Sequence, residues 1–204
     1  MTIIVDYGMG NLRSVAKAAE HLGKGVRISD KASIIDKATK IVFPGVGHFA
    51  GAVKELKKRK LIPVLKKKIK DGIPFLGICV GMQLLFESSE EAPGVKGLGV
   101  VEGVVKKFKN TKLIVPHMGW NQVQTRDQRP ETRDIFDGVD DGSYFYFAHS
   151  YYCKPKKNKT ILTTTNYGIN FASSLRQDNV WGVQFHPEKS QKLGLKVFNN
   201  FLNL

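Results

Sequence analysis

The chain has 204 residues, with 32 Lys and Arg against 18 Asp and Glu, and a formal net charge of +14. A chain of this length buries roughly 70% of its unfolded surface as one domain, so we expect a single domain over residues 1–204, and its two cysteines, Cys79 and Cys153, predict reduced thiols and a cytoplasmic protein. No apolar run approaches the ~20 residues of a membrane span, and the first residues lack the basic leader of a signal peptide, so we expect no membrane segment and no export.

The positive charge is concentrated between Lys54 and Lys70, where nine of seventeen residues are Lys or Arg. Apolar residues recur there at spacings of three to five, as on two amphipathic helices: Val53, Leu56, Leu61, Leu65 and Ile69. The lysines then form the solvated faces of these helices. A nucleic-acid site is the alternative, which we disfavour because such sites interleave stacking aromatics and this stretch contains none.

Strand-like and helix-like segments alternate through the first half, which is typical of an α/β domain with a largely parallel sheet. Residues 2–6 predict a strand and residues 12–22 a helix with one apolar face. Residues 40–43 predict a second strand, which runs into Pro44-Gly45-Val46-Gly47, and residues 74–77 a third. A helix is expected over residues 82–86.

Shorter strands separated by turns are predicted in the second half. They cover residues 97–109, 144–147 and the segments around Ile114 and Val123, and we expect them to be antiparallel additions to the sheet. Residues 180–185 predict a last strand that ends at His186. The closing helix has one apolar face, which should pack on the sheet: Leu193, Val197, Phe198 and Phe201.

Cys79 lies between two glycines, in Gly77-Ile78-Cys79-Val80-Gly81, at the junction of a predicted strand and a predicted helix. This is the layout of a nucleophile elbow, in which a sharp turn exposes the reactive side chain and flanking glycines prevent collisions. The helix N-terminus favours a negatively charged thiolate. A buried structural cysteine is an equally good interpretation of Cys79 alone.

His186-Pro187-Glu188 follows the last predicted strand, at the carboxyl edge of the sheet where the Cys79 turn should also lie. His186 is therefore a candidate proton acceptor and donor for Cys79, with Glu188 holding the imidazole in the required tautomer. A charged surface turn is the alternative for His186 to Glu188 taken alone. Together the two segments favour a catalytic triad.

The loop at Pro44 to Gly47 also follows a strand, and oxyanion holes draw one N–H from such a loop and one from the residue after the nucleophile. Val46 and Val80 match those positions. Glycines let a peptide rotate, so the hole could form only when substrate or partner is bound. An ordinary Pro-Gly turn is the alternative.

Pro44 to Gly47, Gly77 to Gly81 with Gln83, and His186 to Glu188 together resemble the class I, or triad, glutamine amidotransferases over the whole chain. The resemblance implies their three-layer α/β fold, with a largely parallel central sheet, helices on both faces and added antiparallel strands. It also implies a glutaminase that uses Cys79, His186 and Glu188, through a γ-glutamyl thioester, without a cofactor.

Four segments narrow this resemblance: residues 6–14, 44–49, 116–121 and 186–190. They look like the glutaminase subunits of imidazole glycerol phosphate synthases, which act in histidine biosynthesis. That likeness implies a heterodimer in which ammonia passes to a (β/α)8-barrel cyclase subunit. The cyclase makes imidazole glycerol phosphate and an aminoimidazole carboxamide ribotide. Glutaminases that serve pyridoxal phosphate, purine or anthranilate synthesis remain the alternative, as does a dead amidase kept as a scaffold.

The resemblance also implies roles for residues outside the triad. Gln83 lies one helical turn beyond Cys79 and would reach the α-carboxylate or α-amine of glutamine, and Gly47, Ser150 and Tyr151 would hold the substrate. Residues expected to face the cyclase are Asn11, His117, Trp120, Tyr146 and Lys189.

The remaining candidate residues have structural interpretations. His21 should end one helix and His48 should begin another, and their spacing with the cysteines gives no metal-ligand pattern, so we expect no metal. Cys153 falls in a loop-like stretch without an elbow, and we expect it to be incidental. Two residues of the aromatic run 144–147 should point into the core.

Overall fold

A computed structural model describes residues 1–109, 113–125 and 135–204. One large mixed sheet organises the part of the chain so described, with the strand order β2-β1-β3-β4-β12-β11-β10-β7-β8. The strands from β2 to β12 in this order are parallel, and those from β12 to β8 are antiparallel. The strands are β1 (Thr2–Val5), β2 (Val26–Ser29), β3 (Lys40–Gly45), β4 (Phe75–Cys79), β5 (Phe86–Ser89), β6 (Val101–Lys107), β7 (His117–Thr125), β8 (Ser143–His149), β9 (Tyr151–Pro155), β10 (Ile161–Asn166), β11 (Asn170–Gln177) and β12 (Val180–Val183).

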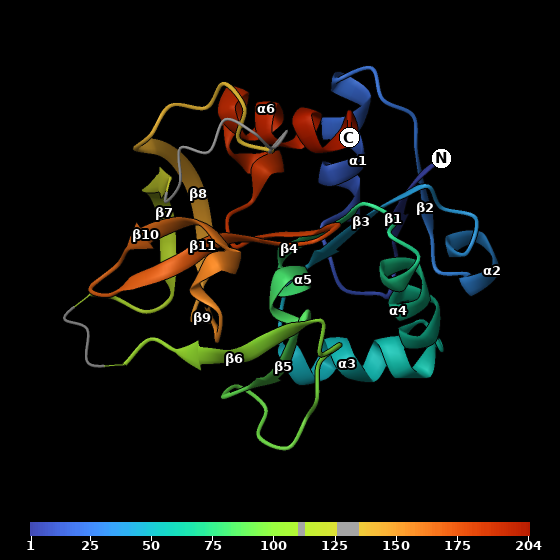
Figure 1. Ribbon diagram of the computed structural model, residues 1–204, viewed down its shortest axis with the longest axis horizontal. Coiled ribbons are helices and arrows are strands. Elements are labelled where there is room, and N and C mark those ends of the chain that lie inside the picture. Colours follow the sequence, from blue (N-terminus) through green and yellow to red (C-terminus); the bar gives the residue numbers. More distant parts are fainter. Residues whose placement is uncertain (110–112, 126–134) are drawn as a thin grey trace.

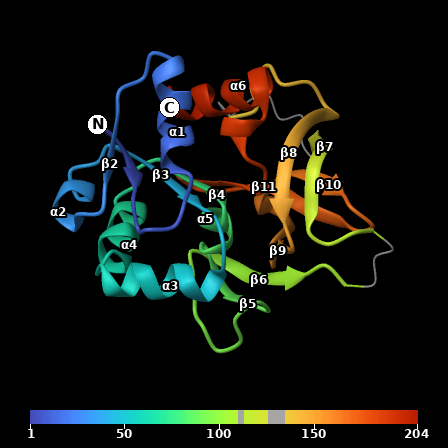
Figure 2. The same ribbon diagram turned by 180° about the vertical axis from the view of Figure 1, so that it is seen from behind.

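Helices cover both faces of the parallel part of the sheet (Figures 1 and 2). One face carries α1 (Leu12–His21) and α6 (Gln191–Leu202), and the other carries α3 (Phe49–Lys58), α4 (Ile62–Lys70) and the short α5 (Val80–Gln83). The small α2 (Ala32–Ile35) lies near the β2 edge, and two 3₁₀ turns, η1 (Asn158–Thr160) and η2 (Pro187–Lys189), complete the described elements. This arrangement is the three-layer α/β fold that the sequence predicts. No described helix is long and apolar enough to cross a membrane.

The apolar faces predicted for the helices are buried where they meet the sheet. Val53, Leu56, Leu61 and Leu65 are at most 3% exposed, as are Val197, Phe198 and Phe201 of α6. Burial of apolar side chains at this scale stabilises the fold at roughly 25 cal/mol per Å² of area removed from water. The core of the two layers therefore depends on residues that the helical periodicity identifies.

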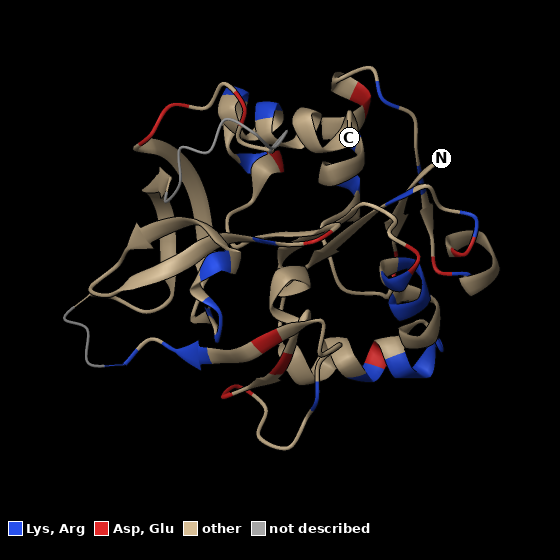
Figure 3. Ribbon diagram, in the orientation of Figure 1, with Lys and Arg blue, Asp and Glu red and all other residues tan. Residues whose placement is uncertain are grey.

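Most Lys and Arg residues of α3 and α4 point to solvent, and the charges of both signs are spread over several elements rather than gathered on one face (Figure 3). Two basic residues of the stretch 54–70 are paired: Arg59, just after α3, with Asp30 and Glu55, and Lys67 of α4 with Asp36. One lysine, Lys68, is buried and donates to the carbonyl oxygen of Asp36 at 3.0 Å. The solvated-face interpretation of residues 54–70 thus agrees with the structure.

Several sequence predictions of local structure are wrong. The strand expected over residues 180–185 ends at Val183, and β6, expected to be purely antiparallel, pairs in parallel with β5 and antiparallel with β9. The helix expected over residues 82–86 ends at Gln83, because Phe86 pairs with Val101 of β6 and begins β5. No strand surrounds Ile114, which is 82% exposed, since Pro116 lacks the N–H that a ladder requires and β7 begins only after it. Residues 97–100 precede β6 instead of belonging to it. Cys153 lies in β9, 1% exposed, and not in a loop.

Candidate functional site

Cys79 ends β4 and immediately precedes α5, with φ +54° and ψ −111°. A positive φ is costly for any residue with a Cβ, and such strain persists only where the surrounding structure fixes it. Register places Cys79 beside Gly45, the last residue of β3. The predicted strand, sharp turn and helix around Cys79 are therefore present, although the helix has a single turn.

Two glycines make this turn possible. A Cβ added to Gly77 would lie 2.8 Å from the carbonyl oxygen of Gly81, and a Cβ added to Gly81 would collide with the carbonyl oxygen of Phe43 in β3. Contacts so short essentially never occur at real Cβ atoms, and both involve backbone that cannot move independently. The glycines thus let α5 approach the sheet closely enough for Cys79 to sit at its edge.

His186 and Glu188 converge on the same edge from the end of β12. The Nδ1 atom of His186 lies 2.9 Å from Oε1 of Glu188, and the two side chains are 4% and 2% exposed. The backbone N–H of His186 donates to the carbonyl oxygen of Tyr146 at 2.9 Å, which ties the histidine to β8. Ser190, which sequence analysis did not identify, donates its hydroxyl to the carbonyl oxygen of His186 at 2.7 Å.

Electrostatics favour a charged His186. Burial opposes the imidazolium, but the neighbouring Cys79 thiolate, by charge and hydrogen bond, and the Glu188 carboxylate outweigh it and raise the pKa of His186 to about 10. An imidazolium next to a thiolate is the charge arrangement of an activated cysteine. The burial of Tyr7 itself, together with the charge of Cys79, raises the pKa of the Tyr7 hydroxyl beneath the turn.

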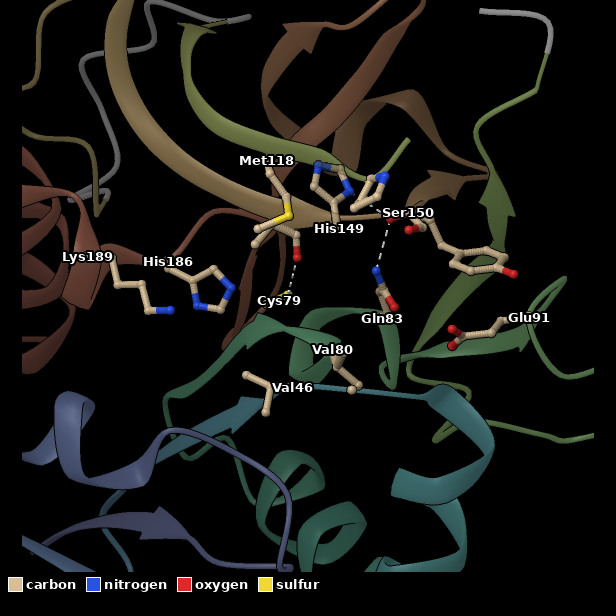
Figure 4. A pocket seen from close by; sticks show the side chains of 14 residues that line it. Val46, Cys79, Val80, Gln83, Glu91, Met118, His149, Ser150, His186 and Lys189 are labelled. Carbon is tan, nitrogen blue, oxygen red and sulfur yellow. Dashed lines mark hydrogen bonds between the residues drawn. The ribbon is translucent and has the colours of Figure 1, made fainter. Parts of the chain in front are cut away.

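A pocket of about 310 Å³ opens over Cys79 (Figure 4). Its walls come from the β3–α3 loop, α5, the start of β7, the β8–β9 loop and the turn after β12. It gathers all the residues predicted for the oxyanion hole and the substrate, along with two triad members: Val46, Gly47, Cys79, Val80, Gln83, Ser150, Tyr151 and His186. Glu188 stands behind His186 and does not line the pocket.

Gln83 is 3% exposed, and its amide is already occupied in the free chain. Its Nε2 donates to the carbonyl oxygen of Tyr151 at 3.0 Å and to Oε1 of Gln184 at 3.2 Å. Val80 is the first residue of α5, so its N–H has no partner within the helix. Val46 follows β3 and precedes Gly47, whose φ is +90°.

Sequence analysis missed two residues of the site, Glu91 and Gln184. Glu91 lines the pocket and accepts from the N–H of Phe49, the first residue of α3, at 2.7 Å. Gln184 is fully buried with Nε2 3.6 Å from Sγ of Cys79. His149, which belongs to the same expected substrate loop as Ser150 and Tyr151, also lines the pocket. The sequence could have indicated Gln184, because it directly precedes Phe185-His186. Nothing near Glu91 in the sequence indicates its position, because it reaches the pocket only through the path of the chain after β5.

The five residues expected to face a partner comprise an exposed cluster of three, a separate exposed residue and a buried one. Trp120, Tyr146 and Lys189 form a cluster on the outer face of β7, β8 and η2, with the Trp120 and Tyr146 rings 6.2 Å apart and Nζ of Lys189 5.7 Å from the Tyr146 ring. Asn11 is exposed and caps α1. His117 is 2% exposed and bonded to His149, so its side chain is internal, and we withdraw it from the expected interface.

The chain matches known proteins in sequence and fold. The family model of glutamine amidotransferase class-I matches residues 3–204, and the chain therefore belongs to that family. Imidazole glycerol phosphate synthase subunit HisH of Moorella thermoacetica is 46% identical over 97% of this chain and 92% of its own length. The protein of the same name from Pyrococcus furiosus is 49% identical over 98% and 97%. These relatives assign the chain to the HisH group of the family.

Solved structures support the fold assignment. A crystal structure described as a glutamine amidotransferase superposes with a TM-score of 0.76 at 18% identity, covering 99% of both chains. The structure of PurLQS from Thermotoga maritima gives a TM-score of 0.71 at 20% identity, over 99% of this chain and 97% of that one. At these identities the likeness establishes the three-layer fold.

Proposed function

We propose that this chain is the glutaminase subunit of an imidazole glycerol phosphate synthase, which hydrolyses glutamine to glutamate and ammonia. The observation that carries the proposal is the convergence of Cys79, at a strained turn in a pocket, with a His186 whose imidazole is hydrogen bonded to the buried Glu188. The identity to HisH subunits supports the choice of glutamine and of this synthase.

The first half of the reaction forms a thioester. The Cys79 thiolate attacks the side-chain amide carbon of glutamine, and the carbonyl becomes a tetrahedral oxyanion. His186 donates its proton to the amide nitrogen, the carbon–nitrogen bond breaks, and ammonia leaves. Because Glu188 accepts from Nδ1 of His186, the proton that is transferred to the substrate is the one on Nε2. The Glu188 carboxylate also stabilises the imidazolium before the transfer.

The second half regenerates the thiolate. His186, now neutral, takes a proton from water, and the resulting hydroxide attacks the γ-glutamyl thioester carbon. The carbon–sulfur bond breaks, which releases glutamate and the Cys79 thiolate. In both halves the oxyanion is stabilised by the N–H of Val80 and, once the loop peptide is turned toward the pocket, by the N–H of Val46. That N–H belongs to the peptide that joins Gly45 to Val46, and the missing Cβ of Gly45 provides the freedom for the rotation.

The pocket offers suitable partners for both charged groups of the substrate. The Glu91 carboxylate lies in the wall of the pocket and suits the α-ammonium group. Backbone and side-chain groups of Ser150 and Tyr151, with the amide of Gln83, suit the α-carboxylate. Since Gln83 already bonds Tyr151 and Gln184, substrate binding would have to redistribute these hydrogen bonds.

We propose that a (β/α)8-barrel cyclase docks on the outer face of β7 and β8. These two strands contain no Asp, Glu, Lys or Arg, and alternate residues expose Met118 (64%), Trp120 (46%) and Tyr144 (54%). Aromatic and Met residues are enriched at protein interfaces and charged ones depleted. Met118 and Lys189 also line the pocket, so this face borders the place where ammonia is released. Asn11 belongs to the same proposed interface.

Two further assignments belong to the proposal. The family match across residues 3–204 supports a single glutamine amidotransferase domain. Two free, buried cysteines among the described residues support a reducing compartment, and we assign the enzyme to the cytoplasm.

The decisive experiment compares Cys79→Ala with the unaltered chain, each mixed with a cyclase subunit. The variant should abolish glutamine-dependent synthesis and keep ammonia-dependent synthesis near its original rate, because the cyclase site is untouched. Loss of both reactions would contradict the assignment. Glutamine hydrolysis that is indifferent to cyclase and nucleotide would indicate a free-standing glutaminase, and co-purification with a different synthase would indicate another pathway.

A further inference from the structure

A buried chain of hydrogen bonds ends on the sulfur of Cys79. Nε2 of Gln184 donates to Sγ of Cys79 over 3.6 Å, and Oε1 of Gln184 accepts from Nε2 of Gln83 at 3.2 Å. The same nitrogen of Gln83 donates to the carbonyl oxygen of Tyr151 at 3.0 Å. Gln184 is 0% exposed and Gln83 3%. The nucleophile is thus linked through two amides to the start of β9.

The carbonyl of Tyr151 determines the direction of this chain. A carbonyl oxygen only accepts, so the NH2 end of the Gln83 amide must face it. The second N–H of that group then faces Gln184, which must present its Oε1, and this leaves the NH2 end of Gln184 toward the sulfur. Reversing Gln83 would bring its oxygen against the Tyr151 carbonyl oxygen, and reversing Gln184 would bring two NH2 groups together; either is costly in a buried site. Cys79 therefore meets a donor.

A second set of bonds holds the Tyr151 carbonyl in place. Nδ1 of His149 lies 2.8 Å from it and must donate, so the neutral ring accepts at Nε2 from Nδ1 of His117 at 3.0 Å. Nδ2 of Asn121 completes the series at 3.2 Å from Nε2 of His117. Burial lowers the pKa of His117 to about 4 and that of His149 to about 3, so both rings are neutral near pH 7.

The neighbours of Sγ distinguish its two protonation states. As a thiol, Cys79 donates toward the carbonyl oxygen of Ala148 at 4.0 Å, and this interaction is lost when the proton leaves. As a thiolate, it is only an acceptor, and the N–H of Gln184 then points at a full negative charge. Hydrogen bonds to ionised groups are roughly twice as strong as neutral ones. Gln184 therefore favours the thiolate.

We propose that Gln184 is a further catalytic residue, which stabilises the Cys79 thiolate before attack and again as the leaving group of thioester hydrolysis. Gln83, His149 and His117 are positioning residues that keep its N–H directed at the sulfur. The inference rests on the proposed function for the identity of the reaction. The protonation of Cys79, however, is measurable without glutamine or cyclase.

The test is the pH dependence of Cys79 alkylation by iodoacetamide, located by mass spectrometry in the full chain. Gln184→Met keeps the volume and removes the donor, and we expect the alkylation rate near pH 7 to fall about 10-fold, with the half-maximal pH raised by about one unit. Gln83→Met leaves Gln184 in place but unoriented, and a smaller change in the same direction is expected. The matched control is Gln177→Met. Gln177 ends β11, and its Nε2 donates to the carbonyl oxygen of Val100 at 2.8 Å, so this variant also loses an amide hydrogen bond but should react like the unaltered chain.

A Gln184→Met profile that overlays the original, with an unchanged urea midpoint, would overturn the proposal. If that variant does not fold, an unchanged profile in Gln83→Met overturns it equally. An unaltered chain whose Cys79 resists alkylation at every pH would overturn both this inference and the proposed function. If Gln184→Met leaves the alkylation profile unchanged while the unaltered chain still supports glutamine-dependent synthesis, only the role of Gln184 is refuted and the proposed function stands.

Discussion

Glu188 offers a test of how the site activates its histidine. Glu188→Gln preserves the size of the side chain but removes the negative charge 2.9 Å from Nδ1 of His186. A hydrogen bond to a charged group contributes ~1.5–3 kcal/mol, so kcat/KM for glutamine should fall about 10- to 150-fold. Among the described residues Oε2 of Glu188 has no hydrogen-bond partner, and a buried NH2 in its place adds a desolvation cost of ~1–3 kcal/mol.

The variant should also change the pH profile in a defined direction. Glu188 helps to raise the pKa of His186 to about 10, so without its charge the imidazolium is lost at lower pH. The alkaline limb of glutamine-dependent synthesis should therefore move to lower pH, and the acidic side should not move with it.

The assay is synthesis by the reconstituted complex, driven by glutamine or by ammonia, across pH. Ammonia-dependent synthesis should be unchanged. Glu102→Gln is the matched control, because that exposed carboxylate pairs only with surface lysines among its described contacts and should leave both reactions unaltered. An unchanged kcat/KM for glutamine in Glu188→Gln, or an equal loss of both reactions, would refute the reasoning.

Three other outcomes follow from the structure. Gly81→Ala should destabilise the chain by ~1–3 kcal/mol and abolish glutaminase activity, because its Cβ collides with the Phe43 carbonyl, whereas Gly25→Ala, with nothing within 4 Å, should do neither; equal urea midpoints for the two would contradict this. Trp120→Ala should weaken cyclase binding about 10- to 100-fold in a titration, unlike Ile28→Ala, an exposed apolar change on β2, and equal affinities would exclude this face. The free energy of unfolding should decrease as pH falls below 6.5. In the folded state burial lowers the pKa of His117 to about 4 and that of His149 to about 3, so in this range the unfolded chain takes up protons that the folded chain does not. Each proton contributes ~1.4 kcal/mol per pH unit, and a urea midpoint that does not drop between about pH 6.5 and pH 5 would show that these rings are not neutral in the folded state.

Local sequence patterns predict most of what positions the nucleophile. The spacing of apolar residues and the Gly and Pro residues of turns predict β1, β3, β4 and β12 and the buried faces of α1, α3 and α6. Glycines on both sides of Cys79 predict its turn, because that geometry excludes a side chain at Gly81. The strand and helix patterns depend on neighbours within a few residues, whereas the contact that excludes a side chain at Gly81 is with the distant Phe43.

What the sequence does not reveal depends on distant pairing. The helix expected through Phe86 ends early because the chain is drawn into a ladder with Val101. Similarly, β10 and β11 carry buried polar residues such as Thr163 and Ser174, which bond to each other at 2.6 Å and hide the usual apolar pattern of a strand. Gln184 and Glu91 gain their meaning only from atoms that the fold brings next to them.

The strand β12 is the seam between the parallel and antiparallel halves of the sheet, with β4 on one side and β11 on the other. Cys79 belongs to the parallel half, whereas His186 and Glu188 follow the seam near the end of the chain. During synthesis the nucleophile therefore leaves the ribosome long before its base does. A nascent or prematurely terminated chain holds the cysteine without the histidine, so hydrolysis of glutamine begins only when the final strand has been inserted.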